Sequence, residues 1–115
     1  MSETYDLFQT GKRHLAADMP AQATVALEKA KRREPRKASI REALGLAYFR
    51  LHRYGEAERE FRAVIEITPT DDYAYFALGC ILEKRGRTAE ASGQFKLARA
   101  LKPASDLYAK RAGSR

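Results

Sequence analysis

A few small and apolar residues recur every 34 positions along this chain of 115 residues. The interval holds over three copies in four separate columns of the sequence. The columns are Gly11, Gly45 and Gly79; Ala23, Ala57 and Ala91; Leu27, Phe61 and Phe95; and Pro35, Pro69 and Pro103. A fixed period of this size indicates a repeat architecture. We therefore predict three structural units, which span residues 4–37, 38–71 and 72–105.

Each unit contains two stretches with the apolar spacing of a helix. In the middle unit, apolar residues recur every three or four positions from Ile40 to Leu51 and again from Ala57 to Ile65, which is the period of one helix face. Proline or glycine separates the two stretches in every unit, and each second stretch stops before a proline, which disfavours helix in the residue before it. No stretch shows strand alternation. The prediction is an all-α stack of helix pairs, closed by a short capping helix with a polar outer face at about residues 104–112.

The glycine column predicts a close contact between helices. Glycine inside a helix destabilises it by roughly 0.5–1 kcal/mol relative to alanine, so its return at one place in each unit needs a reason. The simplest reason is that the two helices of a unit approach too closely there for a side chain. The expected facing surface on the second helices is the column of small residues, Ala23, Ala57 and Ala91.

These columns resemble the tetratricopeptide repeat (TPR), a pattern of 34 residues with W-x-x-L-G-x-x-Y, then A-x-x-x-F, then P. The middle unit matches it through Leu44, Gly45, Tyr48, Ala57, Phe61 and Pro69. The first unit departs from it, with Thr10 and His14 where the pattern has Leu and Tyr. The resemblance covers about residues 4–105. It implies a right-handed superhelical stack of three TPR-like helix-turn-helix repeats, forming a single domain over residues 1–115, that binds other proteins.

Composition fits one globular domain, since 44% of the residues are hydrophobic and 32% are charged. The chain has one cysteine, Cys80, which rules out an intramolecular disulfide and favours a cytoplasmic setting. The first ten residues lack the pattern of a signal peptide, and no run of about 18 apolar residues predicts a membrane span. We therefore expect a cytoplasmic protein without membrane contact.

A second apolar stripe runs along the first helix of each unit. Positions 2, 5, 9 and 12 of the units point about 130° away from the stripe that packs inside the unit, and seven of these twelve positions hold Tyr, Phe or Leu. Exposed apolar patches of this kind usually mark interaction surfaces, although each aromatic residue could instead pack against the neighbouring unit. The TPR resemblance places a concave groove on this side.

We predict that this groove binds an apolar or amphipathic segment of another protein, as a helix or an extended strand. Aromatic side chains would anchor the segment, while Lys12 and Lys84 would orient acidic groups at the rim. The candidate groove residues are Tyr5, Phe8, Lys12, Leu46, Phe49, Tyr73, Phe76, Cys80 and Lys84.

One kind of TPR partner is not expected. Many TPR co-chaperones hold the C-terminal carboxylates of heat-shock chaperones in a clamp of Lys, Asn, Asn, Lys and Arg. In this chain the corresponding positions hold Phe8, Lys12, Ala43, Tyr73 and Ala77. Only Lys12 is cationic, and it stands where the clamp has Asn. Because a buried terminal carboxylate needs several charged donors, this groove is unsuited to such a tail.

The net charge of +7 leaves a nucleic-acid alternative open. Residues 1–37 carry eight basic and five acidic side chains, residues 38–71 carry five and six, and residues 72–115 carry nine and four. The densest basic run is Lys29 to Lys37. Cations there favour the negative end of a helix, but they could also contact RNA or an acidic partner. A third alternative is self-association, in which a second copy covers the exposed aromatic residues.

No pattern in the sequence predicts catalysis. A nucleophile elbow, a glycine-rich phosphate loop and paired carboxylates beside a histidine are all absent. His14 and His52 lack a second ligand at metal spacing, and Cys80 suits a small apolar filler. The glutamates of the middle unit, Glu56, Glu58 and Glu60, are expected on a solvated helix face. We predict a protein that is not an enzyme and that uses no cofactor or metal.

Overall fold

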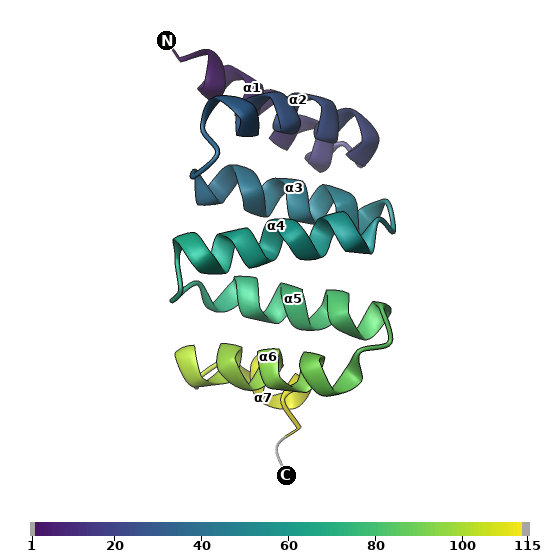
Figure 1. Ribbon diagram of the computed structural model, residues 1–115, viewed down its shortest axis with the longest axis vertical. Helices are drawn as coiled ribbons and strands as arrows, with labels where there is room; N and C mark the ends of the chain where they lie inside the picture. The colour runs from purple at the N-terminus through teal and green to yellow at the C-terminus, as the bar shows by residue number, and fades with distance from the viewer. Residues whose placement is uncertain (1, 114–115) are drawn as a thin grey trace.

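The computed structural model describes residues 2–113, within which the chain forms seven helices and no strands (Figure 1). Six helices form three successive pairs, and the seventh covers the last pair. They are α1 (Glu3–Ala16), α2 (Pro20–Arg33), α3 (Ala38–Arg50), α4 (Tyr54–Ile67), α5 (Asp72–Lys84), α6 (Thr88–Leu101) and α7 (Asp106–Arg111). The prediction of an all-α stack with a short last helix is therefore confirmed. The outermost residues of the predicted domain, at position 1 and positions 114–115, lie outside the described part.

The helices stack in chain order along an axis of 49 Å, with cross-sections of 25 and 21 Å. Each helix packs most extensively against the other member of its pair, and the pairs then meet through α2 with α3 and α4 with α5. The second helices end two residues before Pro35, Pro69 and Pro103, as the sequence predicted. The result is an open, elongated stack whose first helices, α1, α3 and α5, lie along one side.

The turn inside each pair has the same backbone conformation in all three units. Asp18, His52 and Gly86 are 34 positions apart and have φ of 58°, 59° and 78°. Positive φ in this range favours glycine, so the third turn uses the residue best suited to it. The sequence did not reveal this shared position, because two of its three residues are not glycine.

The predicted close contact inside each pair is present, but its partner differs from the one expected. A Cβ built on Gly45 would lie 2.4 Å from the Phe61 ring, and one on Gly79 would lie 2.5 Å from the Phe95 ring. The nearest atoms therefore belong to the Leu27, Phe61 and Phe95 column. The side chain that packs directly against each glycine is therefore a large one and not the alanine that the sequence predicted as the matching surface.

We expect Gly79→Ala to lower the free energy of unfolding by about 1–2 kcal/mol, because the new methyl group would overlap a fully buried ring. Gly93→Ala in α6 is the matched control. A Cβ there meets nothing within 4 Å, so this change should raise the free energy of unfolding by about 0.5–1 kcal/mol. Urea denaturation followed by circular dichroism measures both. Shifts of the same sign in the two variants would contradict the packing account.

Two of the three glutamates predicted on a solvated face of α4 are buried, which corrects that prediction. Glu60 is 5% exposed and accepts hydrogen bonds from Lys31 Nζ at 2.9 Å and Arg41 Nη1 at 3.2 Å. Glu58 is 8% exposed and accepts from the guanidinium groups of Arg85 and Arg87 at 3.1 and 2.9 Å. Because residues two apart lie on opposite flanks of a helix, one glutamate ties α4 to the preceding unit and the other ties it to the following unit.

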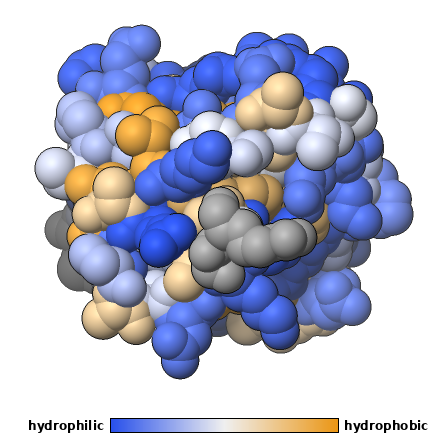
Figure 2. Space-filling model, turned by 90° about the horizontal axis from the view of Figure 1, so that it is seen from below, coloured by the Kyte–Doolittle hydropathy of each residue, from blue (hydrophilic) through white to orange (hydrophobic). Residues whose placement is uncertain are grey.

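The last helix, α7, caps the stack through one side only. Tyr108 is 7% exposed and donates its hydroxyl to Asp72 Oδ2 at 2.7 Å, while the Arg111 guanidinium lies 4.7 Å from the centre of the Phe95 ring. On the outer side, Leu107 is 51% exposed. The predicted polar outer face is therefore only partly polar. Figure 2, which looks at this end of the stack, shows apolar surface between the polar side chains.

Candidate functional site

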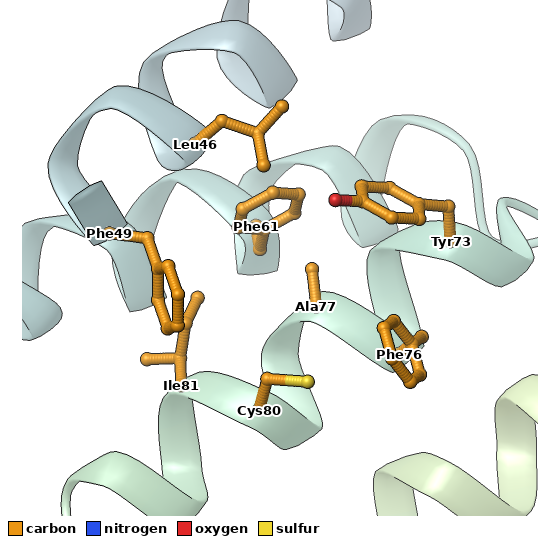
Figure 3. A pocket seen from close by; sticks show the side chains of 8 residues that line it. All are labelled: Leu46, Phe49, Phe61, Tyr73, Phe76, Ala77, Cys80 and Ile81. Carbon is orange, nitrogen blue, oxygen red and sulfur yellow. The ribbon is translucent and has the colours of Figure 1, made fainter. Parts of the chain in front are cut away.

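Two adjoining cavities lie along the first helices. The first, of about 170 Å³, is called the Phe76 cavity; it is lined by Leu46, Phe49, Phe61, Tyr73, Phe76, Ala77, Cys80 and Ile81 (Figure 3). The second, of about 390 Å³, is called the Lys12 cavity; it is lined by Phe8, Lys12, Leu15, Ala16, Ser39, Glu42, Ala43, Leu46 and Arg50. Leu46 lines both, so the two cavities adjoin. We call them together the groove.

The Phe76 cavity is apolar and rich in aromatic rings. Its rings form a chain in which Phe61 and Tyr73 have centroids 6.2 Å apart and Tyr73 and Phe76 have centroids 6.3 Å apart. Figure 3 shows Leu46 and Tyr73 pointing toward the Phe61 ring from different helices. An apolar cavity of about 150 Å³ is large enough to hold a benzene ring. The Phe76 cavity can therefore take one aromatic or branched side chain.

The thiol of Cys80 lines this cavity but is not a strong nucleophile. Burial raises the pKa of the Cys80 thiol, and the nearby cations Arg111 and Lys84 oppose that rise only in part. A thiol with a raised pKa stays protonated at neutral pH and reacts slowly. This behaviour agrees with the interpretation of Cys80 as a small apolar filler. Within residues 2–113, no cluster of three His, Cys, Asp or Glu side chains is arranged to hold a metal ion.

The Lys12 cavity presents two exposed cations. Lys12 Nζ lies 5.1 Å from the centre of the Phe8 ring, and Arg50 Nη1 donates a hydrogen bond of 2.7 Å to the backbone oxygen of Leu15. Neither side chain forms a salt bridge with any other residue in the range 2–113. Both charges therefore remain free to meet an acidic group from outside the chain.

A carboxyl group with an unusual proton affinity lies at the opposite edge of the groove. Burial, the charge of Asp71, a hydrogen bond with Asp71 and the charge of Asp72 together raise the pKa of Glu42 to about 7. Glu42 lines the Lys12 cavity, next to the start of α5. Its charge at neutral pH is therefore only partial.

We expect stability to depend on the ionisation of Glu42. Its folded pKa lies above the 4.5 of an ordinary glutamate, so the folded state holds the proton more tightly and loses stability as pH rises from about 4.5 to 7. Glu42→Gln should change the free energy of unfolding little at pH 5 and raise it by about 1 kcal/mol at pH 8, a value reduced for partial exposure. Urea denaturation at both pH values measures this. The exposed Glu66→Gln is the control, and an equal response of both variants would contradict the assignment.

The structure brings seven of the nine predicted groove residues into the groove: Phe8, Lys12, Leu46, Phe49, Tyr73, Phe76 and Cys80. Tyr5 is 53% exposed and lines a separate hollow with Phe8 at the start of α1. Lys84 is exposed at the end of α5 and lines neither cavity. The sequence reasoning did not place the other residues there, chiefly Leu15, Glu42, Phe61, Ala77, Ile81 and Arg50. Leu15 and Glu42 occupy positions of the predicted stripe, whereas Phe61 belongs to a second helix, which the stripe does not include.

A stack of helix pairs that repeats one packing contact every 34 residues, with a groove along its first helices, defines a helical-repeat protein. Two family models described as tetratricopeptide repeat match residues 38–71 and 60–91. The chain belongs to the tetratricopeptide repeat family, with about three repeats. A curated mouse protein, Superkiller complex protein 3, is 33% identical over 87 residues, which are 76% of this chain. The chain spans only 6% of the length of that relative.

Solved structures with the same fold include three TPR proteins of lower identity. A crystal structure of MamA superposes with a TM-score of 0.94 at 20% identity, covering 97% of this chain and 66% of that one. The first TPR of Spaghetti (RPAP3), bound to the HSP90 peptide SRMEEVD, superposes with a TM-score of 0.91 at 17% identity. The match covers 97% of this chain and 89% of that one. The OM64 TPR domain of Arabidopsis superposes with a TM-score of 0.91 at 18% identity, covering 96% of this chain and 92% of that one. These similarities show that the fold is a right-handed superhelical TPR stack.

None of the helices in residues 2–113 combines the length and the apolar character that crossing a membrane requires.

Proposed function

We propose that this protein is a non-catalytic interaction module, acting as an adaptor or scaffold in the cytoplasm, that binds an apolar or amphipathic segment of another protein in its groove. The observation that carries the proposal is the open Phe76 cavity, where aromatic side chains line a space that residues 2–113 leave unfilled. Aromatic anchors in such pockets dominate interface energetics. In this proposal the repeats 4–37, 38–71 and 72–105 act as one domain over residues 1–115.

The family supports a protein partner, because TPR proteins are an interaction fold and the RPAP3 repeat is bound to a peptide. The same kind of tail is not the partner proposed here. The positions that would hold its terminal carboxylate carry Phe8, Ala43, Tyr73 and Ala77 besides Lys12. Four of these five side chains lack a positive charge, so a terminal carboxylate placed among them would lose its hydration without adequate replacement.

The test is affinity capture from a lysate of the source cells with the folded wild-type protein and two variants. Phe8→Ala/Tyr73→Ala/Phe76→Ala removes groove rings. Val25→Ala/Leu97→Ala removes apolar side chains that are 60% and 47% exposed and line neither cavity of the groove. Circular dichroism checks that each variant is folded, and Tyr73→Ala alone, at a position already 37% exposed, serves if the triple variant is not.

Specific proteins should be captured by the wild type and by the Val25/Leu97 variant, and lost with the groove variants. Capture that is unchanged by the groove variants would overturn the proposal. Capture dominated by nucleic acid would do the same, and would direct attention to the basic run from Lys29 to Lys37.

Self-association is the second candidate. It is favoured by the exposed leucines near the C-terminal end of the stack, Leu97, Leu101 and Leu107, which are 47%, 41% and 51% exposed. An open repeat stack needs a cover for an apolar end. A mass measurement over a range of protein concentrations tests it: a concentration-dependent dimer that Leu107→Lys abolishes would support this candidate, and a monomer at all concentrations would refute it.

RNA binding is weaker as a candidate, because ion pairs within the protein occupy part of the basic run. Lys31 pairs with Glu28 at 3.1 Å and Glu60 at 2.9 Å, and Arg33 pairs with Glu3 at 2.5 Å. Each such pair reduces the positive field available to phosphates.

A further inference from the structure

The two edges of the groove carry opposite charge. Lys12 and Arg50 lie toward the C-terminal ends of α1 and α3. Glu42 lies in the N-terminal half of α3, beside Asp71, which is the N-cap of α5 and accepts a hydrogen bond from the Ala74 backbone at 3.1 Å. Along α3, Leu46 lies between Glu42 and Arg50, about one helical turn from each. A segment lying in the groove would therefore meet cations on one flank and carboxyl groups on the other.

The cations of the basic edge differ from the other arginines near the ends of the first helices. Arg53, Arg85 and Arg87 pair with glutamates of the same chain, at 2.5, 3.1 and 2.9 Å. Lys12 and Arg50 have no such partner within residues 2–113, although both line the Lys12 cavity. Charge complementarity across an interface determines which partners are accepted. The unpaired cations therefore point to an acidic group in the occupant.

We propose that the groove selects a partner segment in which an apolar residue is followed or preceded at short distance by an acidic residue. The apolar side chain enters the Phe76 cavity, the acidic side chain faces Lys12 and Arg50, and the flank facing Glu42 and Asp71 carries no acid. Since Leu46 lines both cavities, the two partner residues are about one helical turn apart, roughly four residues in a helix. This inference rests on the proposed function and adds the chemistry of the partner.

The proposed contact differs from the clamp that holds a chain terminus. Arg50 does not occupy a clamp position, and the acidic group here is an internal side chain. An acid on the opposite flank would approach Glu42 and Asp71, and this like-charge contact opposes binding. The charge of the occupant therefore sets its orientation across the groove as well as its affinity.

The test is a selection from a random library of 16-residue peptides displayed on phage. It is run against the wild type and against Lys12→Glu/Arg50→Glu. Lys12→Glu alone is the second variant, since within residues 2–113 the Lys12 side chain contacts the Phe8 ring and donates no hydrogen bond that its loss would remove. Lys29→Glu/Arg32→Glu is the matched control, because it reverses two charges on α2 that line a different hollow. Tyr73→Ala reports whether the selected peptides occupy the groove.

Wild-type selection should enrich peptides with Phe, Leu or Trp within about four residues of Asp or Glu. The charge-reversed variants should enrich Lys or Arg at the same place, and the α2 control should retain the wild-type pattern. For a selected peptide, fluorescence anisotropy at low salt should give binding about five- to tenfold weaker with Lys12→Glu.

Two outcomes would overturn this inference and leave the proposed function standing. In the first, the selected peptides need Tyr73 for binding but show no enrichment of acidic residues. In the second, the charge-reversed variants enrich the same acidic residues as the wild type. The absence of any enrichment that depends on Tyr73 would refute both this inference and the proposed function.

Discussion

Phe61→Ala is expected to lower the free energy of unfolding by about 3–5 kcal/mol. The Phe61 ring is 1% exposed and covers Gly45, and its centroid lies 6.2 Å from that of Tyr73. Removing the ring deletes these contacts and enlarges the Phe76 cavity, which the ring already lines. Folded domains are stable by only about 5–15 kcal/mol, so this one change should remove a large share of the total. Urea denaturation followed by circular dichroism measures it.

A second substitution tests whether the contact with Gly45 is responsible. Gly45→Ala should destabilise the wild type, because its Cβ would lie 2.4 Å from the ring. In the Phe61→Ala protein the same change should stabilise, because the overlap is gone and alanine favours helix by about 1 kcal/mol. Equal effects of Gly45→Ala in both backgrounds would show that the contact between Gly45 and Phe61 is not what determines stability.

Glu60→Ala is expected to lower the free energy of unfolding by about 2–3 kcal/mol. The Glu60 side chain is 6% exposed, and its partners Lys31 and Arg41 are each 22% exposed. Without the carboxylate, Arg41 loses its ion-pair partner and Lys31 keeps only Glu28, so two partly buried cations share one countercharge between the first and second units. Breaking a fully buried pair in this way costs about 3–5 kcal/mol, and the partial exposure of the two cations reduces the expected effect.

Glu66→Ala provides the comparison for that measurement, because Glu66 is an exposed glutamate of the same helix. Surface changes of this kind stay within about 0.5 kcal/mol. If Glu60→Ala and Glu66→Ala shifted the urea midpoint equally, α4 would not be joined to the preceding unit by this ion pair.

The fold was predictable because its information is local and repeats three times. The interval of 34 residues predicted the helix pairs, and the glycine column predicted the close contact between the two helices of each pair. What the interval could not show is how neighbouring units face each other. Glu58 and Glu60 resembled surface residues in the sequence, and their burial follows only once Arg85, Arg87, Lys31 and Arg41 are placed beside them.

The candidate site was predictable to the extent that one helix face determines it. The predicted stripe on the first helices includes Leu46, Phe49 and Phe76, and the structure places all three around the Phe76 cavity. Phe61 also lines that cavity, although it belongs to a second helix and is not part of the predicted stripe. Arg50 was not among the predicted groove residues, because its contact with the groove depends on how α3 packs against α1.

The most direct test of the central claim uses Cys80, which is the single cysteine of the chain and lines the Phe76 cavity. The measurement is the rate at which a soluble thiol reagent modifies Cys80 at pH 8.5, without and with a saturating amount of a peptide from the selection. A Cys80→Ser/Val25→Cys variant carries its thiol at the exposed position 25, which lines neither cavity of the groove, and is the control.

If the groove holds the partner segment, bound peptide should slow modification of Cys80 by about tenfold or more, since occupancy of that order is reached at ten times the dissociation constant. The thiol at position 25 should react at its usual rate. Bound peptide that leaves the rate at Cys80 unchanged would contradict the account and place the interaction elsewhere on the protein.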